Sequence, residues 1–279
     1  MVLMAHNINP FSKLREQIWS RKQLLRMAVH RGVIRAVARR ANKVVFVSEW
    51  SRQEMSSALA IPLEKTSVVY HGVDGIFKSR PKQTALENRV RYILAVSEVL
   101  EHKNFERLIE TFIRLCKSLD EEVHLLIAGR IGSESLRRSL EERLTRESMI
   151  DRVKFLGFVS GEELAALYRQ AELLVFPSVE ETFGFPLIEA MASGLPVVTS
   201  NRSAMPEICG DAAQYFDPLD IDDMTQTIER VLIDPSLRDS LTKRGLKRSE
   251  EFSWIKSANS LLSILNSAAS VTEPIRCES

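Results

Sequence analysis

Two carboxylates, Glu181 and Glu189, stand on either side of a short segment that contains glycine and proline. Gly184 allows the backbone to come close to a ligand, and Pro186 suits the first residue of a helix. The segment follows the apolar run 173–176, so the helix would begin where a strand ends. In parallel sheets such a helix N-terminus binds anions and nucleotides. The two carboxylates could contact two parts of one extended ligand; the alternative is a solvated loop and a helix-dipole partner.

Short apolar runs alternate with helical patterns from about Arg91 onward. The runs are apolar throughout, which is typical of a parallel sheet covered on both faces. Strands are expected at 92–96, 123–128, 153–158, 173–176 and 196–199, and helices at 105–119, 134–147, 162–170, 186–193, 222–233, 236–252 and 254–268. This order predicts an α/β fold with a doubly wound parallel sheet and right-handed crossovers.

The first 84 residues follow a different pattern. Strands are expected at 2–5, 44–48 and 67–70, one long or two short helices at 11–41, and a polar linker at 77–88. This segment is shorter than the roughly 100 to 150 residues of a typical doubly wound domain. We therefore expect a partial N-terminal domain over 1–84 and a complete domain over 85–252. A C-terminal helix over 253–269 could cross back to the N-terminal part, and a disordered tail would follow over 270–279.

Composition excludes several classes of protein. The 279 residues include 38 Lys and Arg against 37 Asp and Glu, so the net charge of +1 argues against a nucleic-acid-binding protein. Three cysteines without a CxxC pair, and five scattered histidines, predict neither a disulfide framework nor a metal site. This cysteine usage suits a reducing, cytoplasmic compartment. We find no apolar run of membrane-spanning length and no signal-peptide pattern.

The segment 180–198 resembles the Glu-x7-Glu signature of family 4 retaining glycosyltransferases with the GT-B fold. Glu181 and Glu189 match its two glutamates, and 183–186 matches the aromatic-Gly-x-Pro between them. Further matches follow in the family's order, at Val47-Ser48-Glu49-Trp50-Ser51-Arg52, His71-Gly72-Val73-Asp74, 153–159 and Pro206-Glu207 with Gly210-Asp211-Ala212-Ala213. The matches extend over about 200 residues. A lone glycine-rich loop would be far less specific.

The resemblance implies transfer of a hexose from a nucleotide-diphosphate sugar to an acceptor hydroxyl, with retention and without a metal ion or other cofactor. Lys103 would stabilise the diphosphate, Glu189 would bind the ribose hydroxyls and Glu181 would face the sugar. Val159 would lie near the base, and His6 would line the sugar-facing rim. The remaining donor-binding residues implied by the resemblance are Phe183, Gly184, Phe185, Leu187, Pro186, His102 and Gly129, although a plain turn explains Gly129 equally well.

One departure concerns the charges near the diphosphate. The family often carries Gly-Arg where this chain has Ser97-Glu98, so one cation is absent. A protonated His102 could partly compensate. A lysine at a helix start is otherwise disfavoured, so Lys103 makes more sense if an anion joins it.

The helical pattern over 11–41 is strongly basic. Leu25, Val29 and Val33 recur on one face, and Arg31 and Arg35 recur on another. One interpretation is a helix that packs into the core and leaves its arginine face in solvent. The other is peripheral contact with an anionic surface at the inner membrane.

We interpret the chain as the donor half of a GT-B glycosyltransferase with part of its acceptor domain, acting on an acceptor sugar or lipid-linked saccharide. The alternative is a non-catalytic nucleotide-sugar-binding subunit, or a truncated product, that needs a partner chain. A GT-B epimerase is a weaker third interpretation. An incomplete domain would also favour self-association.

Overall fold

The structure is a computed structural model that describes residues 1–5, 11–12, 21–78, 90–119 and 122–270. It contains two compact units: Met1–Gly72 together with Phe252–Ser279, and Val73–Glu251. Residues 73–78 therefore fold with the second unit, although we placed them in the N-terminal part. Most of the expected linker and nearly all of the expected tail lie outside the described residues.

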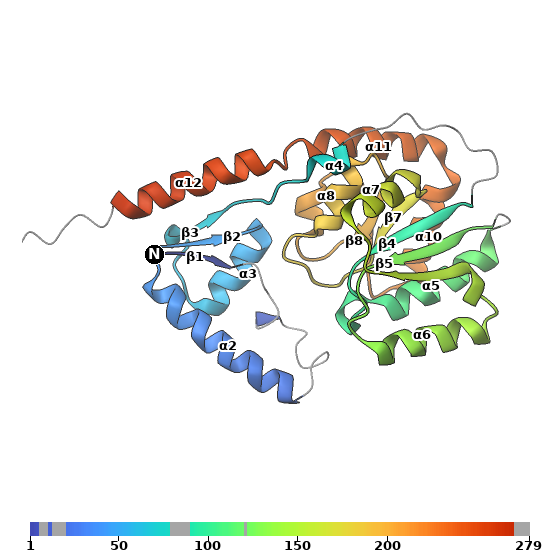
Figure 1. The fold of residues 1–279 in the computed structure, drawn as a ribbon, viewed down its shortest axis with the longest axis horizontal. Coiled ribbons are helices and arrows are strands. Elements are labelled where there is room, and N and C mark those ends of the chain that lie inside the picture. Colours follow the sequence, from blue (N-terminus) through green and yellow to red (C-terminus); the bar gives the residue numbers. More distant parts are fainter. Residues whose placement is uncertain (6–10, 13–20, 79–89, 120–121, 271–279) are drawn as a thin grey trace, which may run out of the picture. The chain divides into compact units, whose positions relative to one another are not determined.

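The Val73–Glu251 unit contains a six-stranded parallel sheet (Figure 1). Its strands lie in the order β6-β5-β4-β7-β8-β9. Their bounds are β4 (Tyr92–Val96), β5 (His124–Ala128), β6 (Val153–Gly157), β7 (Leu173–Phe176), β8 (Val197–Ser200) and β9 (Ala213–Phe216). The chain runs outward from β4 to β6 on one side, then returns to place β7 on the other side of β4. The topological switch point, where ligands of such sheets bind, therefore lies between β4 and β7.

Helices cover both faces of this sheet. Their bounds are α4 (Gly75–Lys78), α5 (Phe105–Ser118), α6 (Glu134–Arg146), α7 (Gly161–Gln170), α8 (Phe185–Ala192), α9 (Met205–Cys209), α10 (Ile221–Ile233) and α11 (Pro235–Ser249), with 3₁₀ turns η3 (Glu101–Lys103) and η4 (Ile150–Arg152). Figure 1 shows α5, α6 and α10 on one face and α7, α8 and α11 on the other. Ile93 and Val175 of the strands pack with Phe112 of α5 and Ile228 of α10 in one apolar core.

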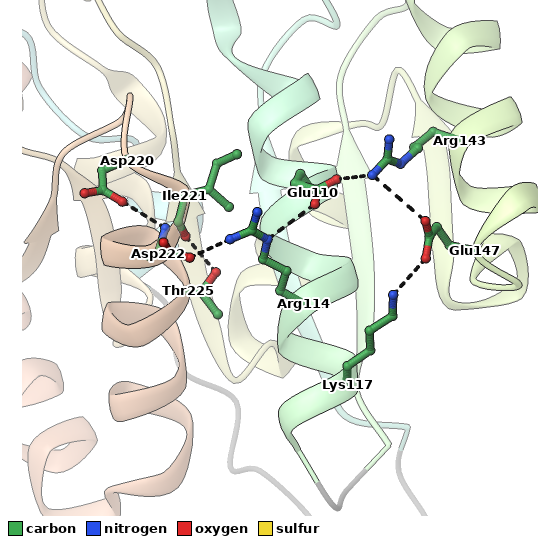
Figure 2. A network of polar contacts seen from close by, with 9 residues as sticks. All are labelled: Glu110, Arg114, Lys117, Arg143, Glu147, Asp220, Ile221, Asp222 and Thr225. Carbon is green, nitrogen blue, oxygen red and sulfur yellow. Dashed lines mark hydrogen bonds and ion pairs between the residues drawn. The ribbon is translucent and has the colours of Figure 1, made fainter.

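A chain of ion pairs joins the outer surfaces of α5, α6 and α10 (Figure 2). Arg114 of α5 contacts Glu110 and Asp222, and Glu110 also accepts a hydrogen bond from Arg143 of α6. Lys117 pairs with Glu147 at 2.8 Å. Exposed pairs of this kind contribute about 0 to 1 kcal/mol each, so the apolar core beneath them dominates the stability of this face.

The smaller unit is built on a three-stranded parallel sheet in the order β1-β2-β3. The strands are β1 (Val2–Ala5), β2 (Lys43–Phe46) and β3 (Thr66–Val68). The helices of this unit are α2 (Arg21–Arg40), α3 (Glu49–Leu59) and α12 (Trp254–Ser270), with the 3₁₀ turn η2 (Leu63–Lys65). Val44 and Phe46 pack with Met55 and Leu59 of α3 in a second core. Ser48 and Ser51 form a capping box at the start of α3. This gives a local structural reason for the serines of the 47–52 motif.

Helix α2 presents its aliphatic stripe to solvent rather than to the core. Leu25, Val29 and Val33 are 69%, 60% and 57% exposed. Arg35 is half-buried instead and donates a hydrogen bond to the carbonyl of Ala58 in α3. The helix therefore packs on the core, as one interpretation expected, but it does so through residues other than this aliphatic stripe. Ala38, near the end of the helix, is buried in the core, and Ile34 packs against it.

The start of α12 packs on the end of the 1–72 segment. Phe252, which is 2% exposed, meets Tyr70 edge to face at 5.9 Å between ring centroids. His71 lies 5.6 Å from the Trp254 ring, and the Ser257 hydroxyl donates to the Tyr70 carbonyl. The last described helix thus belongs to the unit formed by the first 72 residues.

The sequence pattern predicts most of these elements to within two residues at either end. Four helices and strands of the described residues were not predicted, α3, α4, α9 and β9, and neither were the 3₁₀ turns. The last two are only five and four residues long, which leaves little room for periodicity. Among the helices in the described parts of the chain, none is long and apolar enough to cross a membrane.

Candidate functional site

The loops that leave β4 and β7 meet in an ion pair at the switch point. Lys103 Nζ donates a hydrogen bond to Glu181 Oε1 at 2.6 Å. Both side chains are largely buried, with 17% and 16% of their surface exposed. Within the described residues Lys103 makes no other hydrogen bond through Nζ. An ammonium group has three donors, so two remain for a ligand.

Hydrogen bonds to the backbone hold both loops in place. Asn104, buried at the start of α5, donates through Nδ2 to the carbonyls of Pro177 and Pro218 at 3.1 and 2.7 Å. The backbone N–H of Glu181 donates to Ser203 Oγ at 2.9 Å. Because β4, β7, β8 and β9 are successive neighbours in the sheet, these bonds tie together the four loops that follow them at its carboxyl edge.

Helix α8 begins at this edge with no side chain capping it. Gly184 is its N-cap residue, in the left-handed region at φ 91°, and Pro186 is its second residue rather than the first. The packing leaves little room for another side chain, since an added Cβ at Gly184 would lie 2.9 Å from Leu187 Cδ1. Phe183 and Phe185 meet edge to face at 5.5 Å. A helix start without a side-chain cap favours an anion.

Glu189 lies farther along α8 and has a different partner. Its Oε2 accepts a hydrogen bond from the hydroxyl of Tyr168 at 2.9 Å. Burial raises the pKa of Glu189; the Tyr168 hydrogen bond opposes this increase, and the charge of Asp74 adds to it. Glu189 is therefore a carboxylate in a dry environment, where a further hydrogen-bond donor would be strongly favoured.

His102 does not supply the compensating charge. Burial, assisted by the neighbouring Lys103, lowers its pKa from 6.5 to about 4. In the unliganded site the imidazole is therefore neutral at neutral pH. The positive potential near Glu181 comes from Lys103 and the α8 N-terminus instead.

Gly129 and Val159 lie where β5 and β6 end. Gly129 has φ 147°, and an added Cβ there would lie 2.0 Å from the carbonyl oxygen of Ser97. This close approach is sufficient reason for glycine, while contact of Gly129 with a nucleotide stays a prediction. Half-buried Val159 follows Phe158, whose 72% exposed ring lies 5.4 Å from the Arg130 guanidinium carbon.

The sequence interpretation missed Tyr168, Asn104 and Ser203. Tyr168 is buried on α7, and a buried tyrosine hydroxyl needs a hydrogen-bond partner. A tyrosine at an apolar position of the predicted helix could therefore have indicated a buried polar contact. His6 lies outside the described residues, so its expected role stays a prediction. Among the residues that the structure describes, we find no cluster of three His, Cys, Asp or Glu side chains suited to a metal ion.

The fold is of the GT-B type, and residues 76–248 match the family model described as "Glycosyl transferases group 1". The match covers more than half of the chain. The chain belongs to this family, as the Glu-x7-Glu segment predicted.

Two curated relatives are similar to this chain over most of its length. The chain is 32% identical over 222 residues to O-antigen chain mannosyltransferase B of Escherichia coli, covering 77% of this chain and 58% of the relative. It is also 32% identical over 244 residues to the MMP alpha-(1->4)-mannosyltransferase of Mycolicibacterium hassiacum, covering 85% and 57%. The chain thus spans a little over half the length of each relative.

A solved structure shows the same fold. HepE of Anabaena, in complex with UDP and glucose, has a TM-score of 0.79 and 22% sequence identity. The alignment covers 95% of this chain and 71% of that one.

Proposed function

We propose that this chain binds a nucleotide-diphosphate sugar at the switch point of its six-stranded sheet and takes part in retaining, metal-independent hexosyl transfer. The observation that carries this proposal is the Lys103–Glu181 pair beside the uncapped start of α8. Together they offer a cation, open backbone donors and an acceptor within neighbouring loops.

The chemistry follows from where charge develops. When the bond between the sugar and the diphosphate breaks, negative charge accumulates on the leaving phosphate. Lys103 can donate its remaining hydrogens to that phosphate while one stays on Glu181. Fixed donors aimed at developing charge are usually the largest catalytic contribution. Glu181 in turn would face the sugar, and Glu189 would accept from the ribose hydroxyls.

The relatives suggest the identity of the sugar. Both curated relatives are named mannosyltransferases, so we propose mannose as the transferred hexose. One of them is named for the O-antigen chain, which supports a saccharide acceptor, either free or lipid-linked. HepE was solved with UDP and glucose, so uridine donors belong in the same test.

Calorimetry with UDP, GDP and ADP in EDTA tests donor binding. Lys103→Ala should weaken diphosphate binding about tenfold and nucleoside binding much less, because a charge-assisted hydrogen bond contributes about 1.5 to 3 kcal/mol. Glu189→Ala should weaken both, and exposed Lys154→Ala is the matched control. Failure of all three nucleotides to bind the wild-type chain would disprove the donor site.

A transfer assay separates the enzyme from its alternatives. Radiolabelled mannose and glucose donors are offered with lipid-extract acceptors, and the anomeric configuration of any product is read by NMR. Positioning the acceptor can supply about 7 to 11 kcal/mol of the barrier. Donor binding without transfer would favour the non-catalytic subunit or a truncated product that needs a partner chain. Conversion of the donor without transfer would favour the epimerase.

We propose further that α2 makes peripheral contact with an anionic membrane, from a cytoplasmic location at the inner membrane surface. The exposed stripe of Leu25, Val29 and Val33 supports this proposal. The helix also contains Arg21, Lys22, Arg26, Arg39 and Arg40 and no acidic residue. An aliphatic stripe with basic neighbours is suited to the headgroup layer of anionic lipids.

Vesicle sedimentation tests this contact. The chain should bind vesicles that contain phosphatidylglycerol but not pure phosphatidylcholine, and salt should release it. Serine at Leu25, Val29 and Val33 should abolish binding, whereas serine at exposed Leu262 and Leu265 of α12 should not. Dispersal of a dimer by the α2 variant, with no vesicle binding by the wild type, would assign the stripe to self-association instead.

A further inference from the structure

Tyr168 is a fully buried tyrosine whose hydroxyl has a carboxylate as its partner. The side chain is 0% exposed and donates to Glu189 Oε2 at 2.9 Å. It belongs to α7, whereas Glu189 belongs to α8, so the bond joins two neighbouring helices. Tyr168 lies 21 residues before Glu189 and outside the 180–198 signature.

The surroundings fix the tyrosine ring. Phe77 of α4 packs edge to face on Tyr168, with 5.7 Å between ring centroids and 77° between ring planes. The backbone carbonyl of Phe77 accepts a hydrogen bond from Ser193 Oγ at 3.2 Å, which ties α4 to the end of α8. The hydroxyl of Tyr168 is thus held between three packed segments and cannot easily turn away from Glu189.

This contact engages one oxygen of the carboxylate and leaves the other available. Among the described residues, the carboxylate of Glu189 has no second hydrogen-bond partner. Held by Oε2, the carboxylate keeps one rotamer, and Oε1 stays available for a ligand hydroxyl. Orientation of a binding carboxylate by a second, buried polar group reduces the ordering cost of binding.

We propose that Tyr168 is a positioning residue that orients Glu189 toward the ribose hydroxyls of the bound nucleotide. The proposal rests on the donor site proposed above, and it adds a residue on α7 that recognises ribose only through Glu189. The titratable and charged groups with a resolved effect on Glu189 are Tyr168 of α7 and Asp74 just before α4.

Calorimetry with a ribonucleotide and its dideoxy form tests this role. The probe is whichever of UDP, GDP and ADP binds the wild-type chain, together with its 2′,3′-dideoxy counterpart. Tyr168→Phe should weaken the ribonucleotide about fivefold, as expected for one lost hydrogen bond, and leave the dideoxy form unchanged. Tyr92→Phe is the matched control, because its hydroxyl donates to the Leu167 carbonyl of the same helix at 2.9 Å.

A second readout does not require a nucleotide. The Tyr168 hydrogen bond favours the ionised carboxylate, so its removal should raise the pKa of Glu189 further. Carbon-13 NMR titration of the Glu189 carboxyl in wild type and Tyr168→Phe measures that change. An unchanged pKa would show that the bond is not made in solution, which would overturn the proposal.

The outcomes separate the two proposals. Equal weakening of both nucleotides by Tyr168→Phe would indicate a merely structural tyrosine and overturn the positioning role alone. A Tyr168→Phe variant that prefers the ribonucleotide as strongly as wild type would overturn the positioning role as well. If the wild-type chain binds both forms equally, the ribose role of Glu189 fails first, and the role of Tyr168 fails with it.

Discussion

The two units differ in the side chains on the outer surfaces of their helices. In Val73–Glu251 the outward charges of α5, α6 and α10 pair with one another (Figure 2), and both faces of the sheet are covered. In the smaller unit α2 and α12 leave aliphatic side chains such as Leu25 and Leu262 exposed. Exposed apolar side chains also occur in the larger unit, as at Phe158 and Ile233, but on α2 they recur along one stripe of a single helix.

The same contrast holds for chain connectivity. The larger unit is one continuous segment, and its candidate site uses loops from that segment alone. The smaller unit needs both ends of the described chain, since Phe252 packs on Tyr70. Donor binding should therefore depend on local contacts in 73–251, and stability of the smaller unit should depend on the return of α12.

Phe252→Ala tests the second half of this comparison and should have the largest effect. Removing a buried phenylalanine costs about 3 to 5 kcal/mol through lost burial and the cavity left behind. We expect a lower unfolding temperature in scanning calorimetry with nucleotide binding retained. Ile255→Ala, at a 74% exposed position, is the control. Parallel loss of nucleotide binding would show that the two units do not act separately.

Gly129→Ala tests the first half. The added Cβ would meet the Ser97 carbonyl at 2.0 Å in a backbone conformation that disfavours side chains. We expect a destabilisation of about 3 kcal/mol and loss of nucleotide binding, because the β4 and β5 loops must separate. Gly161→Ala is the control, since its Cβ would meet nothing within 4 Å. Unchanged denaturant midpoints in both variants would contradict the packing argument.

His102 should give the smallest effect, one that depends on pH. Its pKa is about 4 in the folded chain and 6.5 when unperturbed, so between these values the unfolded chain binds more protons. Stability therefore falls as pH drops through this window. Between pH 7 and 5, wild type should lose about 2 kcal/mol more than His102→Gln. Chemical denaturation at both pH values measures this, with exposed His30→Gln expected to follow wild type. Identical losses in wild type and His102→Gln would mean that His102 titrates normally.

Local pattern predicted helices and strands better where the signal was long. The 180–198 segment combines a glycine, a proline and an apolar helix face directly after a strand, so it predicted α8 together with Glu181 before it and Glu189 within it. The short α9 and β9 gave no such periodicity. The sequence of α2 has one aliphatic face and one basic face. The spacing of these residues along the sequence does not show which face packs on the core. The structure shows that the aliphatic stripe does not.

The sequence by itself determined the class of fold, the alternation of strands and helices, and the residues of the signature, because these depend on neighbours along the chain. Tertiary structure alone decided which side chains of the candidate site contact one another. Lys103 meets Glu181 across 78 residues, because the strand order places β4 beside β7. Tyr168 meets Glu189 because α7 and α8 pack on the same face of the sheet. It also decided that His102 is neutral, since burial depends on what surrounds a residue in space rather than along the chain.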